Sequence, residues 1–235
     1  MLHQNVSKAR LVSSAAVSTA LVFVATSSIS IYIPATRGYF NLGDSMIFLT
    51  ALLFGPIVGC VAGGLGSMLS DLTLGYVVYA PATLFVKGVE GFITGFLHKA
   101  FAERESRAAR LLMTLLPIPT VVLGSIIVIV LFAGEAEVSM PALGSATVGF
   151  QPILFSVIAV LTVSIIFILR LYGRSMRLIV PCFIGGFEMV LGYFLYELCL
   201  VGLGAVLEVP ANFAQIFLGT LIALPLHNAV RKRMG

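Results

Sequence analysis

The sequence predicts an all-α, polytopic membrane helical bundle of about eight spans. Of its 235 residues, 59% are hydrophobic and 10% are charged, and the mean hydropathy is +1.09. Soluble domains carry about 25% charged residues, so a water-facing fold is excluded. Several apolar runs reach the roughly 18 residues that cross about 30 Å of hydrocarbon as a helix. We therefore expect a single integral membrane domain over residues 1–235.

Hydropathy and basic residues together predict the topology. The expected spans are residues 11–33, 44–60, 62–76, 79–98, 110–133, 150–170, 178–203 and 211–230. An eight-span path puts the four basic clusters on one side, and the positive-inside rule makes that side cytoplasmic, with both termini there. The clusters are Lys8 with Arg10; Lys99, Arg104, Arg107 and Arg110; Arg170, Arg174 and Arg177; and Arg231, Lys232 and Arg233. The net charge of +4 is thus a topology signal, and the first apolar run is too long for a signal peptide.

Glycines predict a tightly packed hairpin in the second and third spans. These spans share few residues, so we expect both to be short and joined by a turn around Gly59 to Gly64. Gly59 and Gly63 are four residues apart, as are Gly91 and Gly95. This small-xxx-small spacing lets helix backbones approach closely inside a membrane.

Three charged residues are expected near the middle of the bilayer. A charged side chain there costs about 2.5–3.5 kcal/mol on insertion scales, so each one is a candidate functional residue. Lys87 and Glu90 are three apart on one helix face and are expected to form an ion pair, with Glu188 at a comparable depth. Glu197 lies on the opposite side of its helix from Glu188, so only one of the two faces a shared pocket. We favour Glu188, because Glu197 could reach the outer interface beside Tyr193 and Tyr196.

Further polar residues lie near the outer ends of the spans. Asp44 opens the second helix, where it could cap free N–H groups. Asp71 is near a helix C-terminus, which disfavours an anion, so it needs a partner such as Arg37 or a ligand. Asn212 starts the last helix, either as an N-cap or as a pocket residue, and Gln215 points an amide inward.

Neither histidine nor cysteine spacing suggests a metal site. His3, His98 and His227 are scattered, and the three cysteines form no CxxC pair.

Four sequence blocks resemble one transporter family. They are "NLGD" from Asn41, "LFGPIVGCVAGGLGSMLSDL" from Leu53, "YAPATLFVKGVEGFITG" from Tyr79 and "VPANFAQIFLG" from Val209. In this order they resemble the substrate-binding S-components of energy-coupling factor (ECF) vitamin importers, especially the riboflavin-type group. The likeness covers residues 11–98 and 178–230. It implies a six-helix core, with residues 110–171 as an inserted helical pair.

The resemblance also implies a binding site, a cargo and partners. The first outer loop would cover a pocket that takes its polar residues from several helices. The implied substrate-binding residues are Asn41, Asp44, Tyr79, Lys87, Glu90, Glu188, Tyr193, Glu197, Asn212 and Gln215. Riboflavin is the first candidate cargo, with pyrimidine, pyridoxine, folate or deazapurine-type compounds as alternatives. Leu2 stands where nickel and cobalt members carry histidine, which favours an organic cargo.

Transport in this family needs other subunits. Ala16 and Ala20 match the AxxxA spacing through which family members dock onto a membrane coupling subunit, which two separate ATPase subunits energise. No Walker motif is present, so we expect any ATP to be hydrolysed by other subunits. We expect this chain to be no enzyme and to carry no cofactor.

Two other classes remain as alternatives. An intramembrane aspartyl protease would use "LGD" and a second membrane aspartate, but Asn41 replaces the first glycine of the GxGD pattern and "PAT" at Pro81 stands where PAL is wanted. A self-sufficient proton-coupled transporter would use Glu90 and Glu188 as proton relays.

Overall fold

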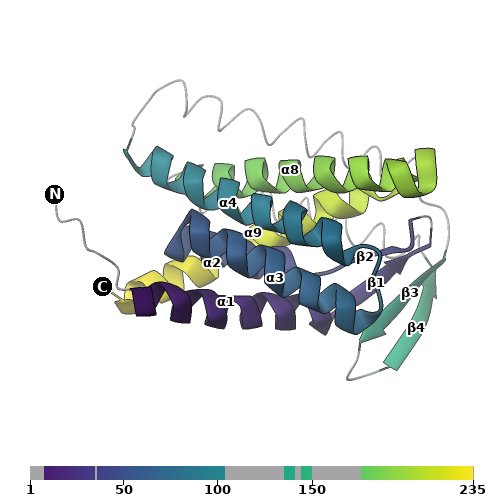
Figure 1. The fold of residues 1–235 in the computed structure, drawn as a ribbon, viewed down its shortest axis with the longest axis horizontal. Helices are drawn as coiled ribbons and strands as arrows, with labels where there is room; N and C mark the ends of the chain where they lie inside the picture. The colour runs from purple at the N-terminus through teal and green to yellow at the C-terminus, as the bar shows by residue number, and fades with distance from the viewer. Residues whose placement is uncertain (1–7, 35, 104–134, 141–143, 150–175, 235) are drawn as a thin grey trace.

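The computed structural model describes residues 8–34, 36–103, 135–140, 144–149 and 176–234 (Figure 1). These residues are mostly helical. In chain order the elements are α1 (Lys8–Ser28), β1 (Ser30–Ile33), β2 (Gly38–Phe40), α2 (Gly43–Phe54), α3 (Pro56–Leu74), α4 (Ala80–Glu103), β3 (Glu135–Met140), β4 (Gly144–Gly149), α8 (Met176–Val201), the 3-10 helix η1 (Gly202–Leu207) and α9 (Val209–Met234).

The helices lie lengthwise in one bundle, and the strands cover one of its ends (Figure 1). Helix α4 packs between α3 and α8, α9 packs on α2 and α8, and α1 packs on α3 and α2. The start of α1 and the end of α9 lie at the end opposite the strands (Figure 1). Segments far apart in the sequence therefore meet just beneath the strands.

Four of the described helices are long and apolar enough to cross a membrane: Lys8–Ser28, Pro56–Leu74, Arg177–Leu207 and Val209–Arg233. Helix α2 is apolar but has only 12 residues, or about 18 Å at 1.5 Å per residue. Helix α4 has 24 residues, among them Lys87 and Glu90. The expected multi-pass helical membrane protein is confirmed. The expected spans at 110–133 and 150–170 lie outside the described residues.

The end of α4 and the start of α8 lie at the same end of the bundle (Figure 1). Helix α4 ends, and α8 begins, at the end of the bundle away from the strands, whereas β3 and β4 lie at the strand end (Figure 1). The pair of spans expected within residues 110–171 stays a prediction.

The first span is shorter than expected. Helix α1 ends at Ser28, and residues 30–33 form β1, so a helix through residue 33 is wrong. Ile31, Tyr32 and Ile33 are β-branched or aromatic, which favours an extended strand over a last helical turn. β1 pairs antiparallel with β2, with Tyr32 opposite Tyr39, and also with β3, giving a four-stranded sheet of order β2-β1-β3-β4.

The turn between the second and third helices also differs from expectation. It falls at Gly55 and Pro56, not at Gly59 to Gly64. Gly55 has φ 89°, a left-handed conformation that costs glycine little, and Pro56 has no N–H to continue α2 but suits the first turn of α3.

The glycines that were expected in this turn instead lie where α3 packs against α4. A Cβ on Gly59 would lie 2.7 Å from the Gly91 carbonyl oxygen, and one on Gly63 would lie 2.4 Å from that of Lys87. Only hydrogen fits at these distances, which confirms the close approach expected from the spacing. This contact holds the backbone of Lys87 directly against α3.

Candidate functional site

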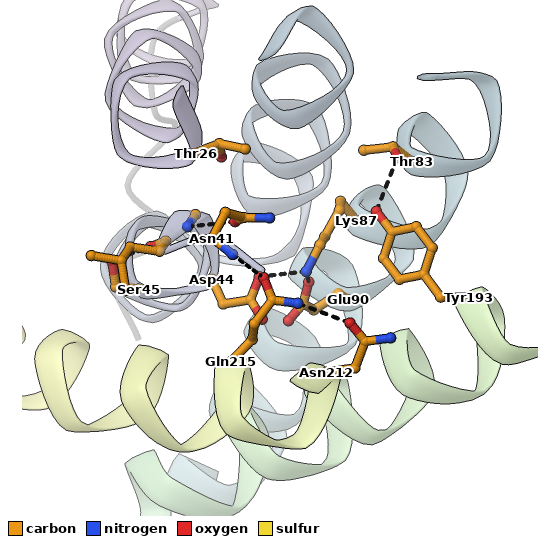
Figure 2. Close-up of polar contacts among 12 residues, drawn as sticks. Thr26, Asn41, Asp44, Ser45, Thr83, Lys87, Glu90, Tyr193, Asn212 and Gln215 are labelled. Carbon is orange, nitrogen blue, oxygen red and sulfur yellow. Dashed lines mark hydrogen bonds and ion pairs between the residues drawn. The ribbon is translucent and has the colours of Figure 1, made fainter. Parts of the chain in front are cut away.

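A buried ion cluster lies where α2 meets α4 (Figure 2). Lys87 donates a hydrogen bond to Asp44 Oδ1, and its Nζ lies 3.1 Å from Glu90 Oε2. Exposed fractions are 2% for Lys87, 1% for Asp44 and 0% for Glu90. The expected Lys87–Glu90 ion pair is confirmed. Asp44 is a second ion partner rather than a helix cap, because α2 has no side-chain cap hydrogen bond.

A chain of amide groups connects α9 to the start of α2 (Figure 2). The Asn41 N–H donates to Gln215 Oε1 at 3.0 Å, and Gln215 Nε2 donates to Asn212 Oδ1 at 2.9 Å. Asn41 Oδ1 in turn accepts the Gly43 N–H at 2.9 Å. Helix α9 begins at Val209, so Asn212 lies inside its first turn and the N-cap interpretation is wrong.

Two tyrosines, one on α8 and one just before α4, complete this side. The Tyr193 hydroxyl on α8 donates to Thr83 Oγ1 on α4 at 3.0 Å, and Lys87 Nζ lies 5.7 Å from the Tyr193 ring centroid. Tyr79, just before α4, donates its hydroxyl to the Thr36 carbonyl oxygen at 2.7 Å. Tyr193 thus connects α8 to α4, and Tyr79 connects the start of α4 to the β1–β2 segment.

The β1–β2 segment (residues 30–34 and 36–40), which we call the lid segment, inserts Tyr39 and Thr36 into the bundle. The Tyr39 hydroxyl donates to Asp71 Oδ1 at 2.7 Å, and Thr36 Oγ1 donates to Glu208. Burial, and then the nearby Asp71 carboxylate, raise the pKa of Tyr39, so its hydroxyl stays protonated. Arg37 is exposed at the turn, so the suggestion that it partners Asp71 is wrong.

Most of these side chains line one small cavity beneath the lid segment. Its free space is about 20 Å³, roughly enough for one water. Its lining residues are Thr26, Gly38, Tyr39, Asn41, Ser67, Asp71, Tyr79, Thr83, Lys87, Tyr193, Glu208, Asn212 and Gln215. Within the described residues, several buried lining atoms have no hydrogen-bond partner, namely Ser67 Oγ, Asp71 Oδ2 and Asn212 Nδ2.

Six of the ten expected site residues line this cavity, and Asp44 and Glu90 support it through Lys87. The other two, Glu188 and Glu197, are not among the lining residues. Glu188 is half-buried, whereas Glu197 is 0% exposed. The expectation that Glu197 reaches the outer interface is therefore wrong.

Glu197 instead lies beside Glu208, at the junction of η1 and α9. Burial, and then the proximity of Glu197, raise the pKa of Glu208. Two carboxyl groups that share a buried site resist ionising together.

Sequence reasoning missed several cavity residues, among them Tyr39, Thr83 and Glu208, and it also missed Thr36, which donates a hydrogen bond to Glu208. Thr36 and Tyr39 belong to the connection between two predicted spans, and Glu208 to the connection before the last one. A polar side chain in a connection outside the hydrocarbon carries no insertion cost, so the sequence does not single it out as functional. Thr83 lies within α4, but a single hydroxyl there can bond to its own helix.

The expected docking residues lie away from the cavity. Ala16 and Ala20 are exposed on α1. Beside Ala16, α1 and α3 form a shallow apolar groove that includes Leu11, Val12, Ile57 and Val61.

Comparison with known proteins identifies the family of this chain. The family model for the ECF-type riboflavin transporter S component matches residues 6–173. The chain belongs to this family. The family match disfavours the aspartyl protease alternative. The geometry disfavours it as well, because Asp44 and Asp71 bond to different partners, Lys87 and Tyr39.

One curated relative adds similarity without a described function. An "Uncharacterized protein in gap 3'region" of Pyrococcus woesei is 53% identical over 78 residues. The match covers 33% of this chain and 52% of the relative, so the chain spans about half the length of the relative that it matches.

Proposed function

We propose that this S-component captures a small vitamin from outside the cell and passes it on through a coupling subunit that two separate ATPase subunits energise. The observation that carries the proposal is the shared cavity. Asn41, Lys87, Tyr193 and Gln215 come from four distant parts of the chain and line the same space. Buried polar atoms that lack partners are costly unless something binds them, and a ligand would satisfy them.

Riboflavin is the first candidate cargo. The family model carries its name, and the cavity combines tyrosine rings with amide and carboxylate groups. Small-molecule pockets commonly have such a lining, with apolar and aromatic walls and a few placed polar groups. A flavin offers a flat ring to the tyrosines and hydroxyl and N–H donors to the acceptors.

The side of entry follows from charge. The basic clusters at Lys8 and at Arg231 to Arg233 lie at the end of the bundle opposite the lid segment (Figure 1). Under the positive-inside rule that end faces the cytoplasm and the lid segment faces outside. Both described chain ends would then be cytoplasmic.

Docking to the coupling subunit is assigned to the outer face of α1. Ala16 and Ala20 are small and exposed there, so a partner helix can approach the α1 backbone closely. The apolar groove beside them extends that surface onto α3. This face is separate from the cavity, so cargo and coupling subunit can bind together.

The proposal is tested by uptake of labelled riboflavin into proteoliposomes that contain this chain with or without a coupling subunit and its ATPases. We expect ATP-dependent uptake only with the complete complex. Asn212→Ala, which removes a cavity amide whose Nδ2 has no partner among the described residues, should abolish that uptake while the protein still inserts. Uptake by the chain alone, driven by a pH gradient, would instead support the self-sufficient proton-coupled transporter.

A further inference from the structure

The lid segment places an aromatic side chain inside the cavity. Tyr39 is 8% exposed, and its ring stacks on Tyr76, with centroids 4.2 Å apart and planes at 24°. Its hydroxyl donates to Asp71 Oδ1 at 2.7 Å. Tyr39 thus occupies a small site that consists of a ring face and a carboxylate acceptor.

The cavity cannot accept a vitamin while Tyr39 is in place. Its free space of about 20 Å³ is far below the roughly 300–1,000 Å³ of small-molecule pockets. Gly38 and Tyr39 are the strand residues of the lid segment that line it, and glycine has no side chain to withdraw. Most of the other lining residues belong to α1, α3, α4, α8 and α9, whose backbones pack together in the bundle. Tyr39 is therefore the side chain that must leave.

Its departure would expose a site with defined chemistry. Asp71 Oδ2 already has no hydrogen-bond partner among the described residues, at 2% exposure, and Oδ1 would lose the Tyr39 donor. The ring face of Tyr76 that Tyr39 covers would become available for stacking. Ser67 Oγ also lines the cavity without a partner. These groups fit an aromatic ring that carries N–H or O–H donors.

Charge excludes an anionic cargo. Among the described lining residues, Lys87 is the only lysine or arginine, and Asp44 and Glu90 already neutralise it. Asp71 and Glu208 add further carboxyl groups. A phosphate or carboxylate on the cargo would meet acceptors without a cation to compensate it.

From these observations we infer that Tyr39 is an internal substitute for the cargo: an aromatic, donor-bearing molecule without negative charge displaces it, stacks on Tyr76 and donates to Asp71. This inference rests on the proposed function, because it assumes that the cavity binds a nutrient. It adds Asp71 and Tyr76 to the binding site and assigns Tyr39 the role of a competitor.

The test is equilibrium binding to the purified full chain. If Tyr39 competes with the cargo, removing its side chain strengthens binding, whereas removing a residue that contacts the cargo weakens it. Tyr39→Ala should therefore lower the Kd for riboflavin at least 10-fold. Tyr39→Phe, which loses only the bond to Asp71, should lower it by a smaller factor. Asp71→Asn should raise it at least 10-fold. Phe40→Ala, at the next residue and on the opposite side of the strand, is the matched control and should change it less than 3-fold. A 10-fold weaker affinity in both Tyr39 variants would overturn the inference.

The charge requirement has its own probe pair. Flavin mononucleotide differs from riboflavin only by a phosphate, and we expect it to bind at least 100-fold more weakly. Thiamine, pyridoxine, biotin and folate extend the comparison. Tight binding of flavin mononucleotide, biotin or folate would overturn the inference and leave the proposed function standing. Failure of every probe to bind the wild-type and Tyr39→Ala proteins would overturn both.

Discussion

Replacing Lys87 by methionine tests the ion cluster most severely. Methionine is about as long as lysine, so the change removes the charge and keeps most of the volume. Lys87 is 2% exposed and serves two carboxylates that are 1% and 0% exposed, so both would be left buried without a cation. Removing one partner of a buried pair costs about 3–5 kcal/mol. Because two anions lose their partner here, we expect about 5 kcal/mol.

Thermal unfolding in detergent measures this loss. For chains of about 150–250 residues, 1 kcal/mol corresponds to roughly 2–4 °C, so Lys87→Met should lower the Tm by about 10–20 °C. Cys182 is fully buried and reports unfolding through a thiol-reactive dye. Cys60, which is half-buried, and Cys199, which is exposed, are replaced by serine to remove background.

The matched control removes the whole cluster. In the triple variant Asp44→Asn, Lys87→Met and Glu90→Gln no buried charge is left unpaired, and replacing an entire buried ion pair is often neutral. We expect its Tm to lie within about 5 °C of wild type by the same conversion. A Lys87→Met protein as stable as wild type, or a triple variant no more stable than the single one, would refute the reasoning.

Three further predictions concern packing, docking and pH. A Cβ on Gly91 would lie 2.2 Å from the Gly59 carbonyl oxygen, so Gly91→Ala should lower the Tm by several degrees. Gly88→Ala is the control, because the nearest neighbour of its Cβ would be 3.5 Å away, and it should leave the Tm unchanged. Equal effects of the two substitutions would contradict the α3–α4 contact. Ala16→Trp should leave riboflavin binding unchanged but block uptake with the coupling complex, and normal uptake would show that the docking face is wrong. Because burial raises the pKa of Glu208, its protonated form stabilises the fold below its ordinary pKa of about 4.3, and this contribution is lost as pH rises through the raised value. Glu208→Gln should therefore match wild type near pH 4 and exceed its Tm increasingly toward pH 8; a difference that does not change with pH would argue against a buried titrating carboxyl.

The membrane bundle and much of the site were predictable from sequence for the same reason. Hydrocarbon makes a polar group expensive wherever it occurs, so Lys87, Glu90 and Gln215 stood out within apolar runs. Helix periodicity then related Lys87 to Glu90 correctly. Their ion pair needed only local spacing.

What failed depended on contacts between distant segments. The run Ile31 to Ile33 is too short for its periodicity to separate strand from helix, and pairing with β2 and β3 decides the outcome. Asp44 was assigned to helix capping because its true partner lies 43 residues away on α4. Glu197 has its neighbour, Glu208, on the far side of η1.

The central claim is that polar residues from distant segments form one nutrient site beneath the lid segment. Native mass spectrometry of the full chain, purified from membranes of cells grown with vitamins, tests it most directly. We expect one bound small molecule per chain, retained by Ala16→Trp and lost in Gln215→Ala, whose side chain bonds both the Asn41 backbone and Asn212. A wild-type chain that carries no small molecule and takes up no added vitamin, or a Gln215→Ala chain that keeps its cargo in full, would contradict the account.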